Sequence, residues 1–241
     1  MLGKPRLRDS HLTKRPYPLG QLPSDSLFNA CRSIAYSIAV GETDLSGKKW
    51  EQIFANAIGG TPLSSPLGLA DVVLDSFAWS VKTVKSNRPH TAKSIRIISG
   101  RNDVNFSYGI ESPLEDINVT GEAVLSIFNE RIKTAKSVYK DLTHSILVRS
   151  QDLKTFTYFE KEAELIDVKS VTWKLNKKNN LQGYDESGKH LYTWQPGGTQ
   201  FTMIYDIPDN AQRFSLRQPK PLDFDSVIEV IGFDKTWINT N

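Results

Sequence analysis

Four side chains in the first half of the chain have the chemistry to act on a phosphate ester: Glu51, Asp71, Ser80 and Lys82. Hydrolysis of a phosphodiester needs an activated water and neutralisation of the charge that builds on the phosphate. Carboxylates hold the Mg²⁺ ions that supply much of both. A nearby lysine can orient or deprotonate the water and stabilise the anionic transition state. These residue types together predict a metal-dependent phosphodiesterase site.

Asp71 and Lys82 belong to the segment LADVVLDSFAWSVKTVK, which begins at Leu69 and alternates like a β-hairpin. With a two-residue turn at positions 76–77, Asp71 lies opposite Lys82. With the turn at positions 75–76, Asp71 lies opposite Ser80. Either register puts all three side chains on one face, whereas a three-residue turn would move Asp71 to the other face. Neither dipeptide is a favoured hairpin turn, so the sequence leaves the register open.

Two amphipathic helices are predicted before the hairpin. The first begins at Ser24 or Asp25 and ends before Gly41, and the second runs from Ser46 to the glycines at 59–60. The apolar face of the second helix consists of Trp50, Ile53, Phe54, Ala57 and Ile58. Glu51 lies at the margin of that face. It can therefore look toward a neighbouring strand, or it can be a surface glutamate that merely flanks the apolar stripe.

The chain after the second helix predicts a mixed α/β sheet. We interpret residues 61–68 (TPLSSPLG) as a linker to the hairpin, followed by a third strand over Ser94–Gly100. A helix of about five turns is predicted from Gly121 to Asp141, and a strand from Ser145 to Arg149. Beyond Gln151 the composition favours further strands, either added to the same sheet or forming a small lobe, with NNLQGYDESGK and QPGG as turns.

The order of a helix with Glu51, then Asp71, eight residues and Ser80-Val81-Lys82 resembles the PD-(D/E)xK nuclease superfamily, most closely its type II restriction endonucleases. The resemblance implies an α-β-β-β-α-β core over residues 25–150, inside one endonuclease domain of residues 1–241. Residues 1–24 would be an N-terminal arm, and residues 151–241 a β-rich part that recognises DNA. It implies one or two Mg²⁺ ions per active site, Asp71 and Glu51 as metal ligands, and Lys82 as the catalytic lysine.

The match departs from the family pattern at two positions. Ala70 stands where proline is expected before the first acid, and Ser80 stands where the second acid is expected. Glu51 is our first choice for the missing carboxylate, followed by Asp75 if the register shifts, and then by the loop residues Asp103 and Glu111. The alternative for Asp71 and Lys82 is an ion pair on an exposed sheet face, which would contribute little.

Polar residues after the third predicted strand and along the basic stretch around it are candidates for DNA contact. They are Arg101, Asn102, Asp103, Asn105, Lys85, Arg88 and Lys177. Arginine can bind guanine and asparagine adenine in the major groove, whereas lysines favour phosphates. A turn with capping side chains is the alternative for residues 101–105. The resemblance also implies double-stranded DNA as partner, and a homodimer, because a palindromic site is matched by a two-fold protein.

Composition and the absence of several known motifs limit the functional classes to which the protein can belong. The 241 residues are 39% hydrophobic and carry a net charge of +3, which permits nucleic-acid binding without requiring it. Cys31 is the only cysteine, and no apolar run reaches the ~18 residues of a membrane span, so we expect a cytoplasmic protein. The resemblance to restriction endonucleases implies a prokaryotic one. The histidines lack zinc-type spacing, and no Walker A, GxSxG or GxGxxG sequence occurs. A repair or mobile-element nuclease and a non-catalytic DNA-binding protein are the remaining alternatives.

Overall fold

The two predicted helices before the hairpin are confirmed in the computed structural model, which describes residues 14–239. Helix α1 spans Ser24–Ala39 and α2 spans Gly47–Ile58. The side chain of Ser46 caps α2 by accepting a hydrogen bond from the Lys49 N–H, and Gly59 ends the helix in the left-handed conformation. Of the predicted N-terminal arm, residues 14–23 are irregular, and residues 1–13 lie outside the described range.

The first sheet is mixed and has six strands in the order β1-β2-β3-β5-β6-β11. Strands β1, β2 and β3 are antiparallel neighbours, β3 and β5 are parallel, and β6 and β11 continue in antiparallel pairing. Helix α4 forms the crossover that parallel pairing of β3 and β5 requires. The strands are β1 (Thr61–Leu67), β2 (Ala70–Leu74), β3 (Phe77–Lys85), β5 (Asp141–Arg149), β6 (Thr155–Glu162) and β11 (Gln212–Ser215). The predicted mixed α/β class is confirmed.

Our interpretation of residues 61–68 as a linker is wrong, because residues 61–67 form strand β1. The segment contains two prolines and two serines, which are poor strand formers, and this composition hid the strand. Strand β1 tolerates proline because it is the edge of the sheet, where a missing N–H disrupts no second ladder. The hairpin strands β2 and β3 are therefore preceded by a strand of their own sheet.

The predicted third strand, Ser94–Gly100, forms but belongs to a second sheet. This antiparallel sheet has the order β4-β10-β9-β8-β7. Its strands are β4 (Ser94–Arg101), β10 (Gln200–Asp206), β9 (His190–Gln195), β8 (Leu181–Tyr184) and β7 (Thr172–Leu175). Strand β8 lies where we expected only turns. Each of the two alternatives for the C-terminal part is confirmed in part. Strands β6 and β11 extend the first sheet, whereas β7, β8, β9 and β10 belong to the second sheet.

Two helices around the crossover differ from prediction. Helix α4 spans Ile117–Val138, so it starts earlier than the predicted Gly121 and ends before Asp141. The side chain of Asp116 accepts hydrogen bonds from the N–H groups of residues 118 and 119 and fixes the start of the helix. A short helix, α3 (Val104–Tyr108), lies in the preceding loop.

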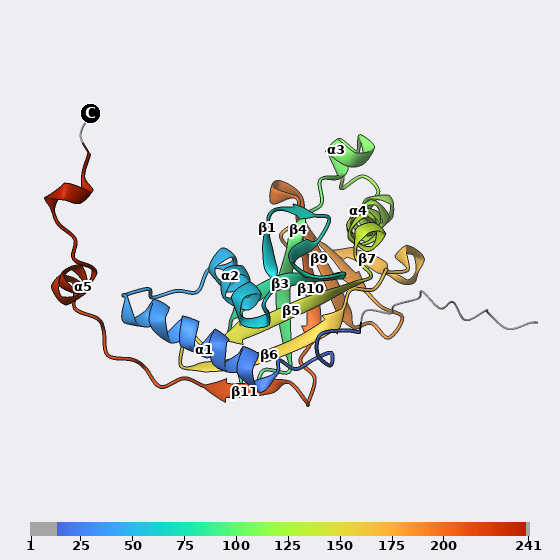
Figure 1. The fold of residues 1–241 in the computed structure, drawn as a ribbon. Helices are drawn as coiled ribbons and strands as arrows, with labels where there is room; N and C mark the ends of the chain where they lie inside the picture. Colours follow the sequence, from blue (N-terminus) through green and yellow to red (C-terminus); the bar gives the residue numbers. More distant parts are fainter. Residues whose placement is uncertain (1–13, 240–241) are drawn as a thin grey trace, which may run out of the picture.

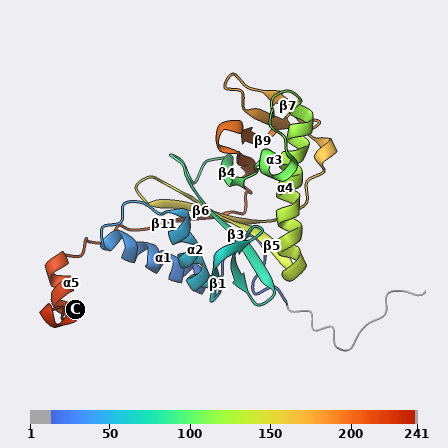
Figure 2. The ribbon, with the colours of Figure 1, turned by 90° about the horizontal axis from the view of Figure 1, so that it is seen from above.

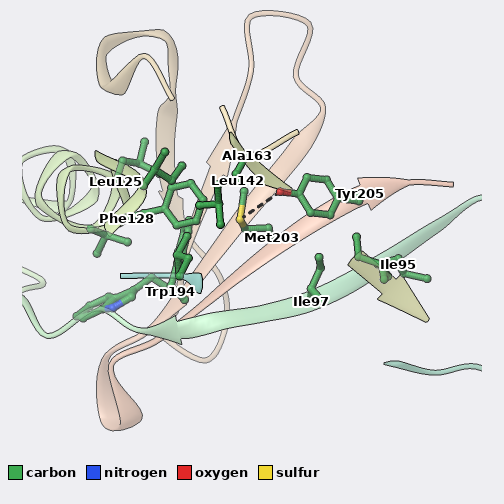
Figure 3. Packing of buried hydrophobic residues seen from close by; sticks show 14 of the residues in the cluster. Ile95, Ile97, Leu125, Phe128, Leu142, Ala163, Trp194, Met203 and Tyr205 are labelled. Atoms are coloured by element: carbon green, nitrogen blue, oxygen red, sulfur yellow. Dashed lines mark hydrogen bonds between the residues drawn. The ribbon is translucent and has the colours of Figure 1, made fainter. Parts of the chain in front are cut away.

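The elements form three layers, with α1 and α2 on one face of the first sheet and α4 with the second sheet on the other (Figures 1 and 2). Phe54 and Trp50 of α2 pack against Trp79 and Tyr158 on the first face. On the second face Phe128 of α4 packs against Phe201, and the Tyr205 hydroxyl lies 3.6 Å from the sulfur of Met203 (Figure 3). The strands of the first sheet are thus covered on both faces.

The rest of the chain consists of short elements. These are η1 (Val168–Ser170), η2 (Pro196–Gly198), α5 (Phe224–Ile231) and η3 (Lys235–Trp237). Helix α5 and η3 lie apart from the layers, beyond one end of α1 (Figure 1). Among the helices of residues 14–239, none has the length and apolar character needed to cross a bilayer.

Candidate active site

The hairpin adopts one of the two registers that the sequence left open. Leu74 pairs with Phe77 and Val72 with Trp79, so the two-residue turn is at positions 75–76. Asp75 has a φ of 52°, a left-handed conformation that aspartate tolerates better than most residues. Continuing this register by one pair places Asp71 opposite Ser80.

Asp71 lies just before Val72, where the pairing between β2 and β3 stops. Its side-chain carboxylate accepts the next hydrogen bond from β3 in place of a backbone carbonyl. A regular ladder would continue to the backbone of Ala70, but the Val81 N–H instead donates to Asp71 Oδ2 at 2.8 Å. The ammonium of Lys82 also donates to Oδ2 at 2.8 Å, and the Ser80 hydroxyl lies 3.4 Å from the same oxygen. The predicted meeting of Asp71, Ser80 and Lys82 on one face is confirmed.

Burial distinguishes this ion pair from an ordinary surface salt bridge. The side chain of Asp71 is 9% exposed and that of Lys82 21%, because α4 and the second sheet cover this face. A carboxylate in such a position is costly unless donors surround it, and the hydrogen bonds to Oδ2 meet that need. The alternative of an ion pair on an exposed sheet face does not fit this burial. The second oxygen, Oδ1, accepts no hydrogen bond from any residue in the range 14–239.

Glu51 is not joined to the Asp71 cluster by any hydrogen bond or ion pair. Its carboxylate lies 3.0 Å from the ammonium of Lys48, one turn earlier on α2. Helix α2 packs on the face of the sheet that carries Val72 and Trp79, whereas Asp71 and Lys82 project from the other face. The sequence predicted that Glu51 meets Asp71 at the site. The structure does not bring the two carboxylates together.

The other acids considered as replacements are used elsewhere or lie in loops. Asp75 is exposed at the hairpin turn. The carboxylate of Asp103 accepts a hydrogen bond from the Phe106 N–H and caps α3. Glu111 is exposed in the loop after that helix.

The Asp71 cluster fits a magnesium ion that keeps most of its water. Across residues 14–239, no three His, Cys, Asp or Glu side chains gather in an arrangement that could hold a metal. Mg²⁺ sites in phosphate-processing proteins are often built from only one or two carboxylates, with substrate oxygens and waters completing the shell. Oδ1 of Asp71 is an oxygen of the right kind, and no donor from residues 14–239 occupies it. The residues present thus suit a site completed by substrate rather than a closed protein cage.

His144 is a neighbour of the site that sequence reasoning missed. It pairs with Ser80 across the parallel β3–β5 ladder, so it shares the face of Asp71 and Lys82. Its ring packs near those of Phe128 and Tyr205, and neither ring nitrogen has a hydrogen-bond partner within residues 14–239. Burial, with Lys82 and Lys161 nearby, lowers the pKa of His144 to about 3. A neutral ring therefore packs beside the Lys82 ammonium. Its only sequence signal is its place in the alternating strand LTHSILV.

On the opposite face of the sheet, the buried carboxylate of Glu160 is the centre of a cluster of hydrogen bonds. It accepts hydrogen bonds from the Trp79 indole N–H, from Arg15 and from the hydroxyl of Tyr17. The Tyr158 hydroxyl and the Gly20 N–H donate to it as well. Burial and the negative charge of Glu160 raise the pKa of Tyr17 above its usual value. This cluster ties residues 15–20 to β3 and fixes the strand that carries Lys82.

The candidate DNA-contacting residues fall into two groups. Arg101, Asn105, Lys85, Arg88 and Lys177 are exposed. Asn102 is fully buried: its amide donates to the Val124 carbonyl, and its side-chain oxygen accepts from Arg131. For Asp103 the structure matches the alternative of a capping side chain, because its carboxylate caps α3. Asn102 is not available for base contact in this conformation.

Comparison of the chain with protein-family models, with curated proteins and with solved structures finds no match.

Proposed function

We propose that this chain is a Mg²⁺-dependent endonuclease that hydrolyses double-stranded DNA at a short specific site, as type II restriction endonucleases do. The observation that carries the proposal is the 2.8 Å contact between Lys82 and the Asp71 carboxylate where β2 leaves β3. The succession α2, β1, β2, β3, α4, β5 agrees with the α-β-β-β-α-β order of the superfamily that the sequence resembles. Its three strands are β1, β2 and β3, with β4 and α3 as insertions.

The roles of the residues follow from their positions. Bound Mg²⁺ would neutralise charge on the phosphate and favour ionisation of the attacking water. Asp71 would hold the ion through its carboxylate, while Oδ2 holds the Lys82 ammonium in place. Lys82 then orients the water and stabilises the charge that develops on the phosphate. Ser80 donates to Asp71 and supports its orientation.

Glu51 remains our proposed second carboxylate for the metal. For this role its side chain must exchange Lys48 for the cation. The Lys48 side chain is 61% exposed, and exposed ion pairs contribute only about 0–1 kcal/mol. Exchanging Lys48 therefore costs little, but the side chain must also reach the metal from the face of the sheet opposite Asp71.

DNA binding is proposed for the exposed cations around the site. Lys85 ends β3, and Arg88 follows in the next loop. Arg101 ends β4, and Lys177 lies in the turn after β7. Cations spaced along a duplex neutralise phosphates and release counterions, so binding should weaken steeply with salt. We also propose that the active form is a homodimer, since two copies are needed to cut both strands symmetrically.

A non-catalytic DNA-binding protein is the second candidate, and one observation favours it. Ser80 replaces the second acid, and the nearest proposed substitute, Glu51, is bonded to Lys48 instead. A repair or mobile-element nuclease on the same core is the third alternative, which differs in substrate rather than in chemistry.

The test is incubation with plasmid and phage DNA, with Mg²⁺ or with EDTA. The proposal predicts discrete Mg²⁺-dependent fragments that disappear in Lys82→Ala and persist in Lys133→Ala, an exposed lysine of α4. Nicking without fixed fragment ends would favour the repair alternative. DNA binding without cleavage under any divalent ion would favour the non-catalytic one.

A further inference from the structure

The C-terminal arm, residues 223–239, carries an apolar surface that the other described residues, 14–222, do not cover. No residue of α5 is buried, and the arm lies apart from the three layers (Figures 1 and 2). Its exposed large apolar side chains are Phe224, Val230, Ile231, Phe233, Trp237 and Ile238. Isolated exposed apolar residues are common, but a cluster of this density on one short segment is typical of a binding surface.

Helix α5 is amphipathic, with its charges on one side. Phe224, Val227, Ile228 and Ile231 follow the three- and four-residue spacing of a single helix face, and Asp225 and Glu229 lie along one side of it. Residues 223–234 contain four acids and no lysine or arginine. A surface that binds this helix should therefore offer both apolar contacts and positive charge.

The groove between α1 and α2 has this character. It encloses about 440 Å³ and is lined by residues of both helices, among them Arg32, Tyr36, Ser37 and Lys49. Arg32 is exposed and forms no ion pair with any residue from 14 to 239, and Tyr36 is 63% exposed. The hydroxyl of Ser37 is buried and has no hydrogen-bond partner among the described residues. Phe28 and Val40 add exposed apolar area on α1.

The arm is poorly placed to fill the groove of its own chain. The Leu222 N–H donates to the Ala39 carbonyl at the C-terminal end of α1, and α5 begins at Phe224. Only Asp223 separates this anchor from the helix, and its side chain caps α5. A reversal over α1 would need a longer connection than one capping residue provides. The anchor thus directs α5 away from the body of its own chain.

We propose that the C-terminal arm of one copy docks its α5 into the α1–α2 groove of a second copy, and that the exchange is reciprocal. A two-fold axis makes both contacts equivalent, so the interface closes as a dimer. The acids of α5 lie against Arg32 of the other copy and compete with Glu42 for its Lys49, and the apolar face covers Tyr36 and its neighbours. This inference does not depend on the nuclease chemistry, since a dimer can form whether or not the Asp71 site is active.

The test is the mass of the full-length protein in solution, measured by sedimentation at micromolar concentration. We expect a dimer for the wild type, and a shift toward monomer for Ile231→Asp and for Arg32→Glu. Combining Arg32→Glu with Glu229→Lys should restore much of the dimer, because the charges are exchanged across the interface. Val119→Asp, which places an acid on the exposed surface of α4, should leave the dimer intact.

Crosslinking identifies the surfaces in contact. In a Cys31→Ser background, a chain with Asn56→Cys mixed with a chain with Glu229→Cys should form a disulfide-linked heterodimer. A wild type that stays monomeric at tens of micromolar would overturn the proposal. So would a dimer that survives Ile231→Asp, or a disulfide that forms within one chain when both cysteines are placed in it and not between mixed chains.

Discussion

The ammonium of Lys82 lies 2.8 Å from Oδ2 of Asp71, across two strands that part at this point. The same oxygen accepts a hydrogen bond from the Val81 N–H. One carboxylate therefore both replaces a backbone acceptor of the β-sheet and forms the ion pair with Lys82. This arrangement leaves Oδ1 without a donor in the part of the chain that the structure describes. The pair is therefore both a structural element of the sheet and the centre of the proposed active site.

Removing the carboxylate should cost stability as well as activity. In Asp71→Ala the Val81 N–H and the Lys82 ammonium lose their acceptor in a largely buried place. Leaving such groups unpaired costs about 1–3 kcal/mol. Urea unfolding should show this loss, while Glu130→Ala, on the surface of α4, should change the free energy of unfolding by less than about 0.5 kcal/mol. An unchanged urea midpoint in Asp71→Ala would mean that the carboxylate does not stabilise the point where β2 and β3 separate.

Glu51 should matter for metal affinity and not for folding. Glu51→Gln removes a carboxylate whose partner Lys48 is exposed, so we expect less than about 0.5 kcal/mol of destabilisation. Cleavage should need more Mg²⁺ and slow by about 100-fold at a fixed concentration. Lys48→Ala is the matched control, because it breaks the same pair and keeps the acid. Equal metal dependence in Glu51→Gln and the wild type would exclude Glu51 as a ligand.

His144 makes the fold sensitive to acid. Its pKa is lowered to about 3 in the folded chain, whereas an unfolded histidine takes up a proton near pH 6.5. The unfolded state therefore binds more protons, and the free energy of unfolding falls as the pH drops from about 6.5 toward 3. Between pH 7 and pH 5 this one group should remove about 2 kcal/mol.

Denaturant midpoints across that pH range measure the His144 effect. His144→Phe keeps a ring between Phe128 and Tyr205 but cannot be protonated, so its stability should vary less between pH 7 and pH 5. The same slope in both proteins would show that the imidazole is not held neutral by its surroundings.

Glu160 should be the most sensitive position on the other face of the sheet. Glu160→Gln places an amide donor among the groups that now donate to the carboxylate, including Arg15 and Trp79. Breaking a buried charge cluster of this kind costs about 3–5 kcal/mol. Hydrogen exchange at residues 15–20 should accelerate together with the loss of stability. Glu162→Gln, two residues later on β6 and exposed, should leave exchange at these residues slow.

Local patterns predicted the elements that place Asp71 and Lys82. The apolar spacing from Trp50 to Ile58 gives α2, and alternation in AWSVKTVK gives β3 with Ser80 and Lys82 on one face. Because side chains alternate with a period of two, a two-residue turn was enough to bring Asp71 to the same face. The hairpin and its facing residues were thus accessible from neighbours in the sequence.

Contacts between distant segments could not be predicted in this way. Strand β4 pairs with β10, about a hundred residues later, and no local signal indicates which sheet it joins. From the sequence, Glu160 is an ordinary acidic residue of a strand. Only the structure shows that Arg15 and Tyr17 donate hydrogen bonds to it. Prolines in β1 gave the signal of a linker, although an edge strand accepts them. Each error arose where tertiary pairing outweighed local propensity.

The most direct test of the proposed function is the single-turnover rate of DNA cleavage by wild type, Asp71→Asn and Lys82→Ala, each matched for DNA binding in Ca²⁺. We predict fixed cleavage positions for the wild type in Mg²⁺. The rate should fall by a factor on the order of 100 or more in each variant, as expected for loss of a group that acts in the transition state. Cleavage at the wild-type rate by Asp71→Asn, or none by the wild type with Mg²⁺ or Mn²⁺ despite DNA binding, would contradict the proposal.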